Sequence, residues 1–239
     1  MKEVGLYVHI PFCKQKCSYC DFNSYVCNED QVHNYIDALI KEIRMYNKQN
    51  QYKFKTVFFG GGTPTFIHYK HIEAIMHEIE PYTVNLESLK AYKTMGINRL
   101  SIGLQAWQPE LQKALGRIHN TEQFLINLEQ ARAVGFMNIS ADLMFALPGQ
   151  SLEMWLETVE RAAELGLKHI SCYSLKVEEG TPFYKLQEQN ELQLPEEELD
   201  RAMYHGANEV LRKHGLYQYE ISNFAAPDYE CKHNLIYWE

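Results

Sequence analysis

Strand-like and helix-like segments alternate along most of this chain of 239 residues. The first segment, 4–9, is short and apolar and is stopped by Pro11. An amphipathic stretch with apolar residues at helical spacing follows at 31–47, and 56–60 is again apolar and rich in β-forming residues. Parallel strands need long crossover connections, which are usually helices. The alternation therefore predicts an α/β fold built on a parallel sheet.

The same alternation continues to residue 221. We expect helices at 68–79, 86–95, 121–134 (with Thr121 as its cap), 152–165 and 195–213, and strands at 99–104, 138–145, 169–175 and 216–221. Right-handed crossovers then give a doubly wound sheet or a complete or partial barrel. In either architecture, ligands bind beyond the carboxyl ends of the strands.

One stretch does not fit this pattern. Residues 80–85 are too few to hold a strand with its two connections, which normally need about ten residues or more. Either a strand is missing between the two flanking helices, or residues are absent from this stretch. The chain also ends abruptly at Tyr237-Trp238-Glu239. This end raises the same expectation that residues are absent from the chain.

The charge balance excludes some partners. The chain has 23 Lys and Arg against 31 Asp and Glu, a net charge of −8, whereas general nucleic-acid binders are basic. No window of about 18 apolar residues exists that would span a membrane. The apolar start of the chain is short and leads directly into cysteines, unlike a signal peptide. We therefore expect a cytoplasmic protein whose six cysteines stay reduced and serve metal or redox chemistry.

Three of these cysteines form a dense group directly after the first predicted strand. Cys13, Cys17 and Cys20 have the spacing Cys-x3-Cys-x2-Cys, which lets three thiolates face one metal centre. Structural zinc sites usually need a fourth ligand, and no second pair of Cys or His residues at that spacing lies nearby. An iron–sulfur cubane held by three cysteines keeps one iron open for a substrate or cofactor. The alternative is a fortuitous group of thiols. Small buried hydrophobes or free thiols are expected at Cys27, Cys172 and Cys231.

A glycine run and three polar residues fall near the ends of predicted strands. The run at 60–62 lets the backbone approach a polar ligand closely, although alone it also fits a tight turn. Gln105, Arg117 and Asp142 offer an amide, a guanidinium and a carboxylate, which suit ribose hydroxyls, a carboxylate and an amino group. Alternatively, Gln105 and Arg117 brace loops, and Asp142 is a buried hydrogen-bonding residue.

Two motifs together resemble a known family. Residues 7–22 read Tyr-Val-His-Ile-Pro-Phe-Cys-x3-Cys-Ser-Tyr-Cys-Asp-Phe, and residues 60–65 read Gly-Gly-Gly-Thr-Pro-Thr. They resemble the radical S-adenosylmethionine (SAM) superfamily and, within it, the oxygen-independent coproporphyrinogen III oxidase-like proteins. The resemblance runs along the whole chain apart from the short stretch near residue 80. It implies an α/β fold that is a partial (β/α)6 TIM-like barrel of the radical SAM type, with the start of a C-terminal extension.

The resemblance also implies cofactors. Three thiolates hold a [4Fe–4S] cluster whose open iron binds the methionine part of SAM, and an electron from the cluster cleaves the sulfonium C–S bond to give a 5′-deoxyadenosyl radical. The family's third-strand glutamate falls within 80–85 and is not assigned. The implied cluster ligands are Cys13, Cys17 and Cys20, and the implied SAM contacts are Tyr7, Tyr19, Gly61, Gly62, Thr63, Gln105, Arg117 and Asp142.

Three features resemble the HemW branch, regarded as heme chaperones, more than the coproporphyrinogen-converting enzyme. Phe22 stands where that enzyme has a fourth cysteine, and only twelve residues precede Cys13 where the enzyme has a long arm. Near the end, His233-Asn-x-x-Tyr237 matches the heme-binding motif of the branch. A neutral imidazole is a good axial ligand of heme iron. Taken alone, however, His233 also fits a structural role, and Cys231 is a competing thiolate ligand.

We therefore expect a heme chaperone that binds a [4Fe–4S] cluster, SAM and heme and passes heme to respiratory proteins. One alternative is an oxygen-independent coproporphyrinogen III oxidase of porphyrin biosynthesis; another is a protein whose cluster or zinc is only a structural clip. No catalytic residue is assigned, although His9 is either a proton donor or a core residue. The implied organisation is a barrel core at 1–175 and an extension at 176–239. Other implied partners are a low-potential electron donor of the flavodoxin or ferredoxin type, a second copy in a homodimer, and a membrane surface contacted peripherally.

Overall fold

The computed structural model describes residues 2–49, 52–79 and 88–238, so the short stretch 80–85 lies outside the described residues. The chain divides into two compact units. The first unit comprises Met1–Lys16, Phe22–Ile97 and Cys231–Glu239, and the second comprises Cys17–Asp21 and Asn98–Glu230. The chain therefore passes from the first unit to the second and back within the cysteine loop.

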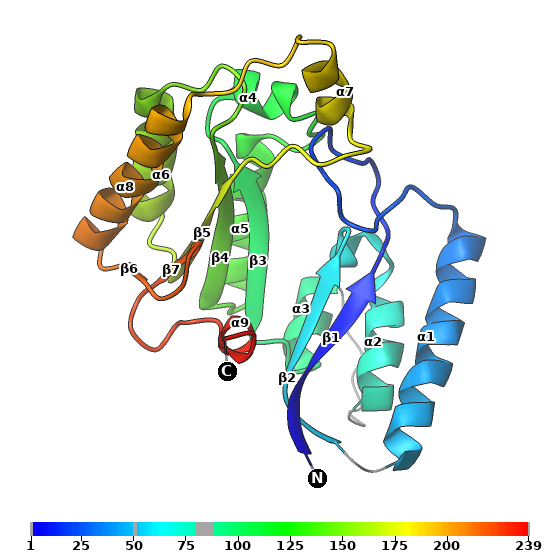
Figure 1. Ribbon diagram of the computed structural model, residues 1–239. Helices are drawn as coiled ribbons and strands as arrows, with labels where there is room; N and C mark the ends of the chain where they lie inside the picture. The colour runs from blue at the N-terminus through cyan, green and yellow to red at the C-terminus, as the bar shows by residue number, and fades with distance from the viewer. Residues whose placement is uncertain (1, 50–51, 80–87, 239) are drawn as a thin grey trace. The chain divides into compact units, whose positions relative to one another are not determined.

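The first unit is built on a two-stranded parallel sheet (Figure 1). Its elements are β1 (Lys2–Ile10), α1 (Glu29–Gln49), β2 (Tyr52–Gly61), a short 3-10 helix (Pro64–Phe66), α2 (Tyr69–Ile79), α3 (Ser88–Thr94) and α9 (Lys232–Ile236). Val4 and Leu6 line an apolar pocket with Ile43 of α1, whereas the Cβ position of Gly5 between them faces His233 of α9. Since successive strand residues face opposite sides, α1 and α9 cover opposite faces of this sheet.

The start of α1 is set by side-chain capping. Asn28 Oδ1 accepts a hydrogen bond from the Gln31 amide at 2.9 Å, and Gln31 Oε1 accepts one from the Asn28 amide at 3.0 Å. This reciprocal pair is a capping box. It begins the helix at Glu29, two residues before the predicted start at 31.

The two strands of the first unit end at the same edge. His9 pairs with Gly60 and Ile10 pairs with Gly61 in the parallel register. The segment with the first cysteine, which follows β1, and the glycine run, which ends β2, are therefore neighbours at the carboxyl edge of the sheet. This is the edge at which α/β proteins bind ligands.

The second unit is built on a five-stranded sheet with the order β3-β4-β5-β7-β6. The first three strands are parallel, and β7 runs antiparallel to both β5 and β6. Its elements are β3 (Arg99–Gln105), α4 (Pro109–Ala114), α5 (Thr121–Ala133), β4 (Asn138–Phe145), α6 (Leu152–Glu164), β5 (His169–Ser174), α7 (Pro182–Glu188), α8 (Glu197–Lys213), β6 (Tyr217–Gln218) and β7 (Asn223–Ala225). Figure 1 shows α6 and α8 side by side, and the buried Trp155 indole of α6 donates to the Met203 carbonyl of α8 at 2.8 Å.

Three local predictions need correction. Asn120, not Thr121, caps α5, because its side chain accepts from the Gln123 amide while the Thr121 hydroxyl donates to the Trp107 carbonyl at 2.9 Å. The predicted strand 216–221 is only β6, since the chain turns at Glu220 and returns as β7. The helix predicted from 195 begins at Glu197. The helices α4 and α7 were not predicted from the sequence.

The parallel pairs β1–β2 and β3–β4–β5, each strand followed by helix, confirm the predicted α/β class. None of the described helices is long and apolar enough to cross a membrane. The boundary predicted at residue 175 stays a prediction.

Candidate functional site

In the first unit, the backbone brings the first cysteine beside the glycine run. The Gly62 amide donates to the Ile10 carbonyl and the Thr63 amide donates to the Phe12 carbonyl, each at 2.8 Å. The buried Cys13 thiol accepts from the Thr63 hydroxyl at 3.7 Å. The predicted cluster ligand Cys13 and the predicted SAM contacts Gly62 and Thr63 therefore adjoin one another.

The glycines are needed because of this close approach. A Cβ on Gly62 would stand 2.6 Å from the Phe12 carbonyl oxygen and 2.8 Å from Cys13 Sγ, closer than real Cβ contacts. Gly61 has a φ of 107°, which L side chains rarely adopt, and a Cβ there would also meet the backbone oxygen of Ile10. The glycine run thus lets β2 meet the cysteine segment backbone to backbone.

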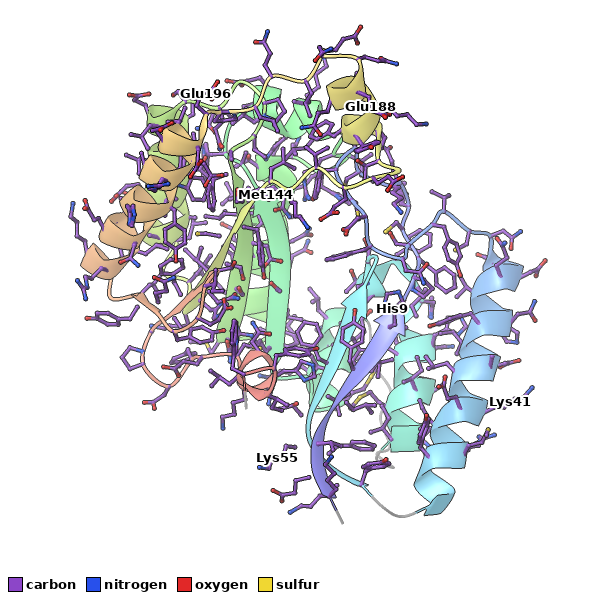
Figure 2. The ribbon with its side chains drawn as sticks, in the orientation of Figure 1. His9, Lys41, Lys55, Met144, Glu188 and Glu196 are labelled. Carbon is purple, nitrogen blue, oxygen red and sulfur yellow. The ribbon has the colours of Figure 1, made fainter. Side chains whose placement is uncertain are left out.

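His9 and Tyr7 lie on β1 beside this edge, and Figure 2 labels His9 near the end of the strand. His9 Nε2 donates to the Asn23 carbonyl at 2.8 Å, and His9 Nδ1 lies 3.3 Å from the Tyr7 hydroxyl. The pKa of Tyr7 is raised by partial burial and by the nearby Tyr237. Both ring nitrogens of His9 are therefore occupied, and a role as proton donor stays a prediction.

In the second unit, the later part of the cysteine loop is fixed by backbone contacts. The Ser18 amide donates to the Leu115 carbonyl at 3.1 Å, and the Ser18 carbonyl accepts from the Phe183 amide of α7 at 3.2 Å. The neighbouring Tyr19 packs against the apolar cluster that contains Leu115 and Phe183. Cys17 and Cys20, on either side, are partly buried. The unpredicted helix α7 thus contributes to holding the loop.

Arg117 contacts β3 and one other predicted SAM contact, Tyr19. Its Nη2 donates to the Gly103 carbonyl at 2.7 Å, and its guanidinium also hydrogen-bonds Tyr19. Burial raises the pKa of Tyr19 to about 12, so the phenol stays neutral. Gln105, the last residue of β3, holds a left-handed φ of 68°, which is uncommon outside glycine.

Asp142 lies on β4, between Gly103 of β3 and Ser171 of β5 in the sheet register. Its Oδ1 accepts from the Ser101 hydroxyl at 2.8 Å. The pKa of Asp142 is raised because the protein surrounds the carboxyl group, although hydrogen bonds from Ser101 and Ser171 and the positive charge of Arg99 act in the opposite direction. The positive charge of Arg117 also lowers the pKa of Asp142, so the two side chains belong to one polar group on this sheet.

His233 and Tyr237, the predicted heme contacts, pack on the first unit. The His233 ring is buried, with Nδ1 2.9 Å from Thr56 Oγ1 and Nε2 3.3 Å from the Tyr237 hydroxyl. The ring also stacks on Phe58 at a centroid distance of 5.0 Å. Burial lowers the pKa of His233, which favours the neutral imidazole that metal ligation needs. Tyr237 itself is exposed.

The chemistry of these residues fits the implied groups. The six cysteines, which all lie within the described residues, form no disulfide with one another. The buried Nε of Arg117 has no hydrogen-bond partner among the described residues, as expected of a donor meant for an anionic ligand. No three His, Cys, Asp or Glu side chains form a ready metal site within 2–49, 52–79 and 88–238, and the ligand set Cys13, Cys17 and Cys20 stays a prediction.

Two groups of residues were missed from the sequence. Thr56 and Phe58 face His233, and their positions two apart on β2 are the only signal that could have placed them together. Ser101 and Ser171 surround Asp142, and they were recognisable only as polar residues within apolar strands.

Comparison with known proteins agrees with these motifs. A family model described as the radical SAM superfamily matches residues 7–162. The chain is similar to the protein named heme chaperone HemW of Bacillus subtilis (strain 168), with 40% identity over 97% of this chain and 66% of that protein. It is also 34% identical to the protein of the same name in Escherichia coli (strain K12), over 100% of this chain and 67% of that protein. The chain thus spans about two thirds of the length of these relatives.

A solved structure is similar as well. Coproporphyrinogen III oxidase (HemN) from Escherichia coli, described as a radical SAM enzyme, matches with a TM-score of 0.80 and 27% identity, over 94% of this chain and 56% of that chain. This chain belongs to the radical SAM superfamily, and its α/β fold is the radical SAM fold. Within the superfamily, the predicted HemW branch is confirmed by the identity to the proteins of that name.

Proposed function

We propose that this chain is the greater part of a heme chaperone, which binds a [4Fe–4S] cluster, SAM and heme and passes heme to respiratory proteins. The observation that carries the proposal is the similarity, along almost the whole chain, to proteins named heme chaperone HemW. The paired side chains of His233 and Tyr237 on the first unit support it.

Cys13, Cys17 and Cys20 would hold the cluster, and the bound cluster would supply a low-potential electron and an open iron for SAM. The residues of this chain supply its surroundings. The buried Cys13 lies beneath Gly62, which brings the polypeptide backbone against the thiol, and the Thr63 hydroxyl donates to it. Tyr7 stays protonated beside this edge because its pKa is raised.

The SAM contacts would come from both the glycine run and the polar strand ends. Gly61, Gly62 and Thr63 offer backbone groups. Arg117 offers a guanidinium nitrogen with no protein partner among the described residues, which suits a carboxylate. Gln105 and Asp142 offer an amide and a carboxyl group, and Tyr19 holds the Arg117 guanidinium by a hydrogen bond.

His233 would bind the heme iron, and the ring of Tyr237 would contact the heme beside it. The competing thiol Cys231 is buried at the start of α9. Six cysteines without a disulfide suit a reducing compartment, so the proposed location is the cytoplasm. The proposed partners are a low-potential electron donor, a second copy of the chain in a homodimer, and a membrane surface contacted peripherally.

The alternative function is oxygen-independent conversion of coproporphyrinogen III. The structural likeness to coproporphyrinogen III oxidase favours it, at a TM-score of 0.80. Phe22 favours the chaperone, because it occupies the place of that enzyme's fourth cysteine according to the resemblance. Its ring is 61% exposed, so this position carries a solvent-facing apolar group in place of a thiol.

An anaerobic heme titration of the full-length, cluster-reconstituted protein tests the proposal, with His233→Ala beside it. We expect a stoichiometric Soret shift in the wild type that weakens at least tenfold in affinity in the variant, by about 1.4 kcal/mol or more. Absence of a specific shift, together with anaerobic conversion of coproporphyrinogen III, would replace the chaperone by the enzyme.

A further inference from the structure

The His233 ring is held by the strands of the first unit on several sides. Thr56 Oγ1 lies 2.9 Å from Nδ1, and Phe58 stacks beneath the ring with an interplanar angle of 16°. Only 7% of His233 is exposed. A ring held in this way has one orientation against the sheet, and its two nitrogens have different surroundings.

Gly5 makes this close approach available. It pairs with Thr56 across the parallel sheet. A Cβ on Gly5 would stand 3.2 Å from His233 Nδ1 and 3.1 Å from Thr56 Oγ1, which is tighter than nine in ten real Cβ contacts. The Nδ1 edge of the imidazole therefore rests directly against the β1–β2 sheet, and no iron-bound macrocycle can reach it without displacing the ring.

The Nε2 edge differs. Its partner is the hydroxyl of Tyr237 at 3.3 Å, which is a long hydrogen bond. Tyr237 is 70% exposed, so its side chain can leave without opening the core. Of the two ring nitrogens, only Nε2 can exchange its present partner for a metal.

A neutral imidazole that binds iron through Nε2 must carry its proton on Nδ1. That proton needs an acceptor, because metal-bound histidines almost always donate the other ring N–H to a neighbouring oxygen, which fixes the tautomer and raises the basicity of the ligand. Among the described side chains, the oxygen within hydrogen-bond distance of Nδ1 is Thr56 Oγ1.

We propose that Thr56 is a positioning residue of the heme site, whose hydroxyl oxygen accepts a hydrogen bond from His233 Nδ1–H and so directs Nε2 to the iron. The inference rests on the proposed heme binding by His233 and deepens it. Tyr237 serves as the hydroxyl that occupies Nε2 until heme replaces it. Gly5 and Phe58 hold the ring in place, and the site extends from the C-terminal motif into β1 and β2.

The test compares Thr56→Val and Thr56→Ser in the full-length, cluster-reconstituted protein. Valine has the shape of threonine without the acceptor and suits a strand, whereas serine keeps the hydroxyl. Heme affinity comes from the Soret titration, and the iron–histidine stretching frequency of the ferrous heme, from resonance Raman spectra, reports the bond at Nδ1. We expect Thr56→Val to weaken heme binding by about tenfold or more and to lower that frequency, and Thr56→Ser to restore both.

A second variant tests the inference at the Nε2 edge of the ring and does not depend on whether Thr56→Val folds. Tyr237→Phe removes only the hydroxyl at Nε2, and we expect it to bind heme a few-fold more tightly than the wild type. Wild-type affinity and an unchanged frequency in Thr56→Val would overturn this inference alone, as would weaker binding in Tyr237→Phe. A wild type without a stoichiometric Soret shift would overturn the proposed function and this inference with it.

Discussion

The carboxyl edge of the first unit's sheet and the sheet of the second unit hold their predicted site residues by different means. At the edge of the first unit's sheet the contacts join backbone groups, because the amides of Gly62 and Thr63 bond the carbonyls of Ile10 and Phe12. Here the strand ends meet so closely that a single Cβ at Gly62 would collide with main-chain atoms.

On the sheet of the second unit, side-chain hydrogen bonds hold the predicted site residues Arg117 and Asp142. Arg117 donates to the Gly103 carbonyl and hydrogen-bonds Tyr19, and Ser101 donates to Asp142. Behind them, the buried His169 bonds the Ser140 hydroxyl at 2.7 Å and the Tyr219 hydroxyl at 2.8 Å.

This difference decides what a substitution does. Backbone contacts tolerate no added atoms, so changes in the first unit should act through steric overlap. Side-chain networks tolerate changes of size but depend on protonation and hydrogen bonds. The variants below test this contrast in order of expected effect.

The largest effect is expected at the cysteine loop. Cys17→Ala should remove most of the iron, sulfide and brown absorbance of the reconstituted protein, because a three-thiolate site loses a ligand that water replaces poorly. The matched control is Cys27→Ala, a partly buried thiol near Cys13 that lies outside the predicted ligand set and whose pKa is raised by burial. Full iron content in Cys17→Ala, or equal loss in both variants, would contradict the ligand assignment.

The next effect is expected at Gly62. In Gly62→Ala the new methyl group would meet the Phe12 carbonyl oxygen at 2.6 Å, and we expect a loss of about 1–3 kcal/mol in the free energy of unfolding, with poor cluster incorporation. Urea unfolding of the cluster-free protein measures the first quantity separately from the second.

Gly206→Ala is the matched control in the second unit. Its Cβ would stand 2.7 Å from Leu156 Cδ2, a similar overlap, but that atom is the end of a flexible side chain. Alanine also favours the interior of α8 by up to about 1 kcal/mol. We expect little change in stability, and a loss equal to that of Gly62→Ala would show that the kind of neighbour does not matter.

Short motifs mark the predicted residues of the cysteine loop and the glycine run more clearly than those on the second unit's sheet, for a physical reason. Backbone approach requires glycine, and cluster ligation requires cysteine, so both leave short motifs at 60–62 and 13–20. Strong apolar patterns also predicted the bounds of β4, Asn138–Phe145, and the start of α6 at Leu152, as the structure has them.

Side-chain networks leave no such motif. Thr56 and Phe58 are ordinary strand residues until α9 folds back onto β2, and Ser101 meets Asp142 only after two strands pair. The sequence likewise does not decide which residue caps a helix where two suitable residues are neighbours, as Asn120 and Thr121 are at the start of α5. These contacts depend on long-range pairing, which local patterns do not contain.

A pH dependence of about 1.4 kcal/mol per pH unit at most is expected from His169. Burial first, and then the charge of Arg99, lower its pKa from 6.5 to about 3. The unfolded chain then binds a proton that the folded one does not, so this contribution to stability is complete above pH 6.5 and is lost as the pH falls toward about 3.

Urea unfolding between about pH 7 and about pH 5, where few carboxylates titrate, measures this slope. His169→Gln should flatten it, because the variant removes the buried imidazole. An unchanged slope in His169→Gln would show that another group is responsible.

The smallest effect is expected at Gln105, where binding and stability should move in opposite directions. Its φ of 68° strains any residue with a side chain, at a cost of about 1 kcal/mol or slightly more, so Gln105→Gly should leave the protein as stable as before or up to about 1 kcal/mol more stable. If its amide addresses SAM, the same variant should bind SAM more weakly by isothermal titration of the cluster-loaded protein.

Ala146, which follows β4 with a φ of 57°, is the matched control for Gln105. Ala146→Gly relieves the same strain without removing a polar group, and SAM affinity should stay at the wild-type value. Equal SAM binding in all three proteins would make Gln105 a loop-bracing residue, and the second unit would then hold SAM without the end of β3.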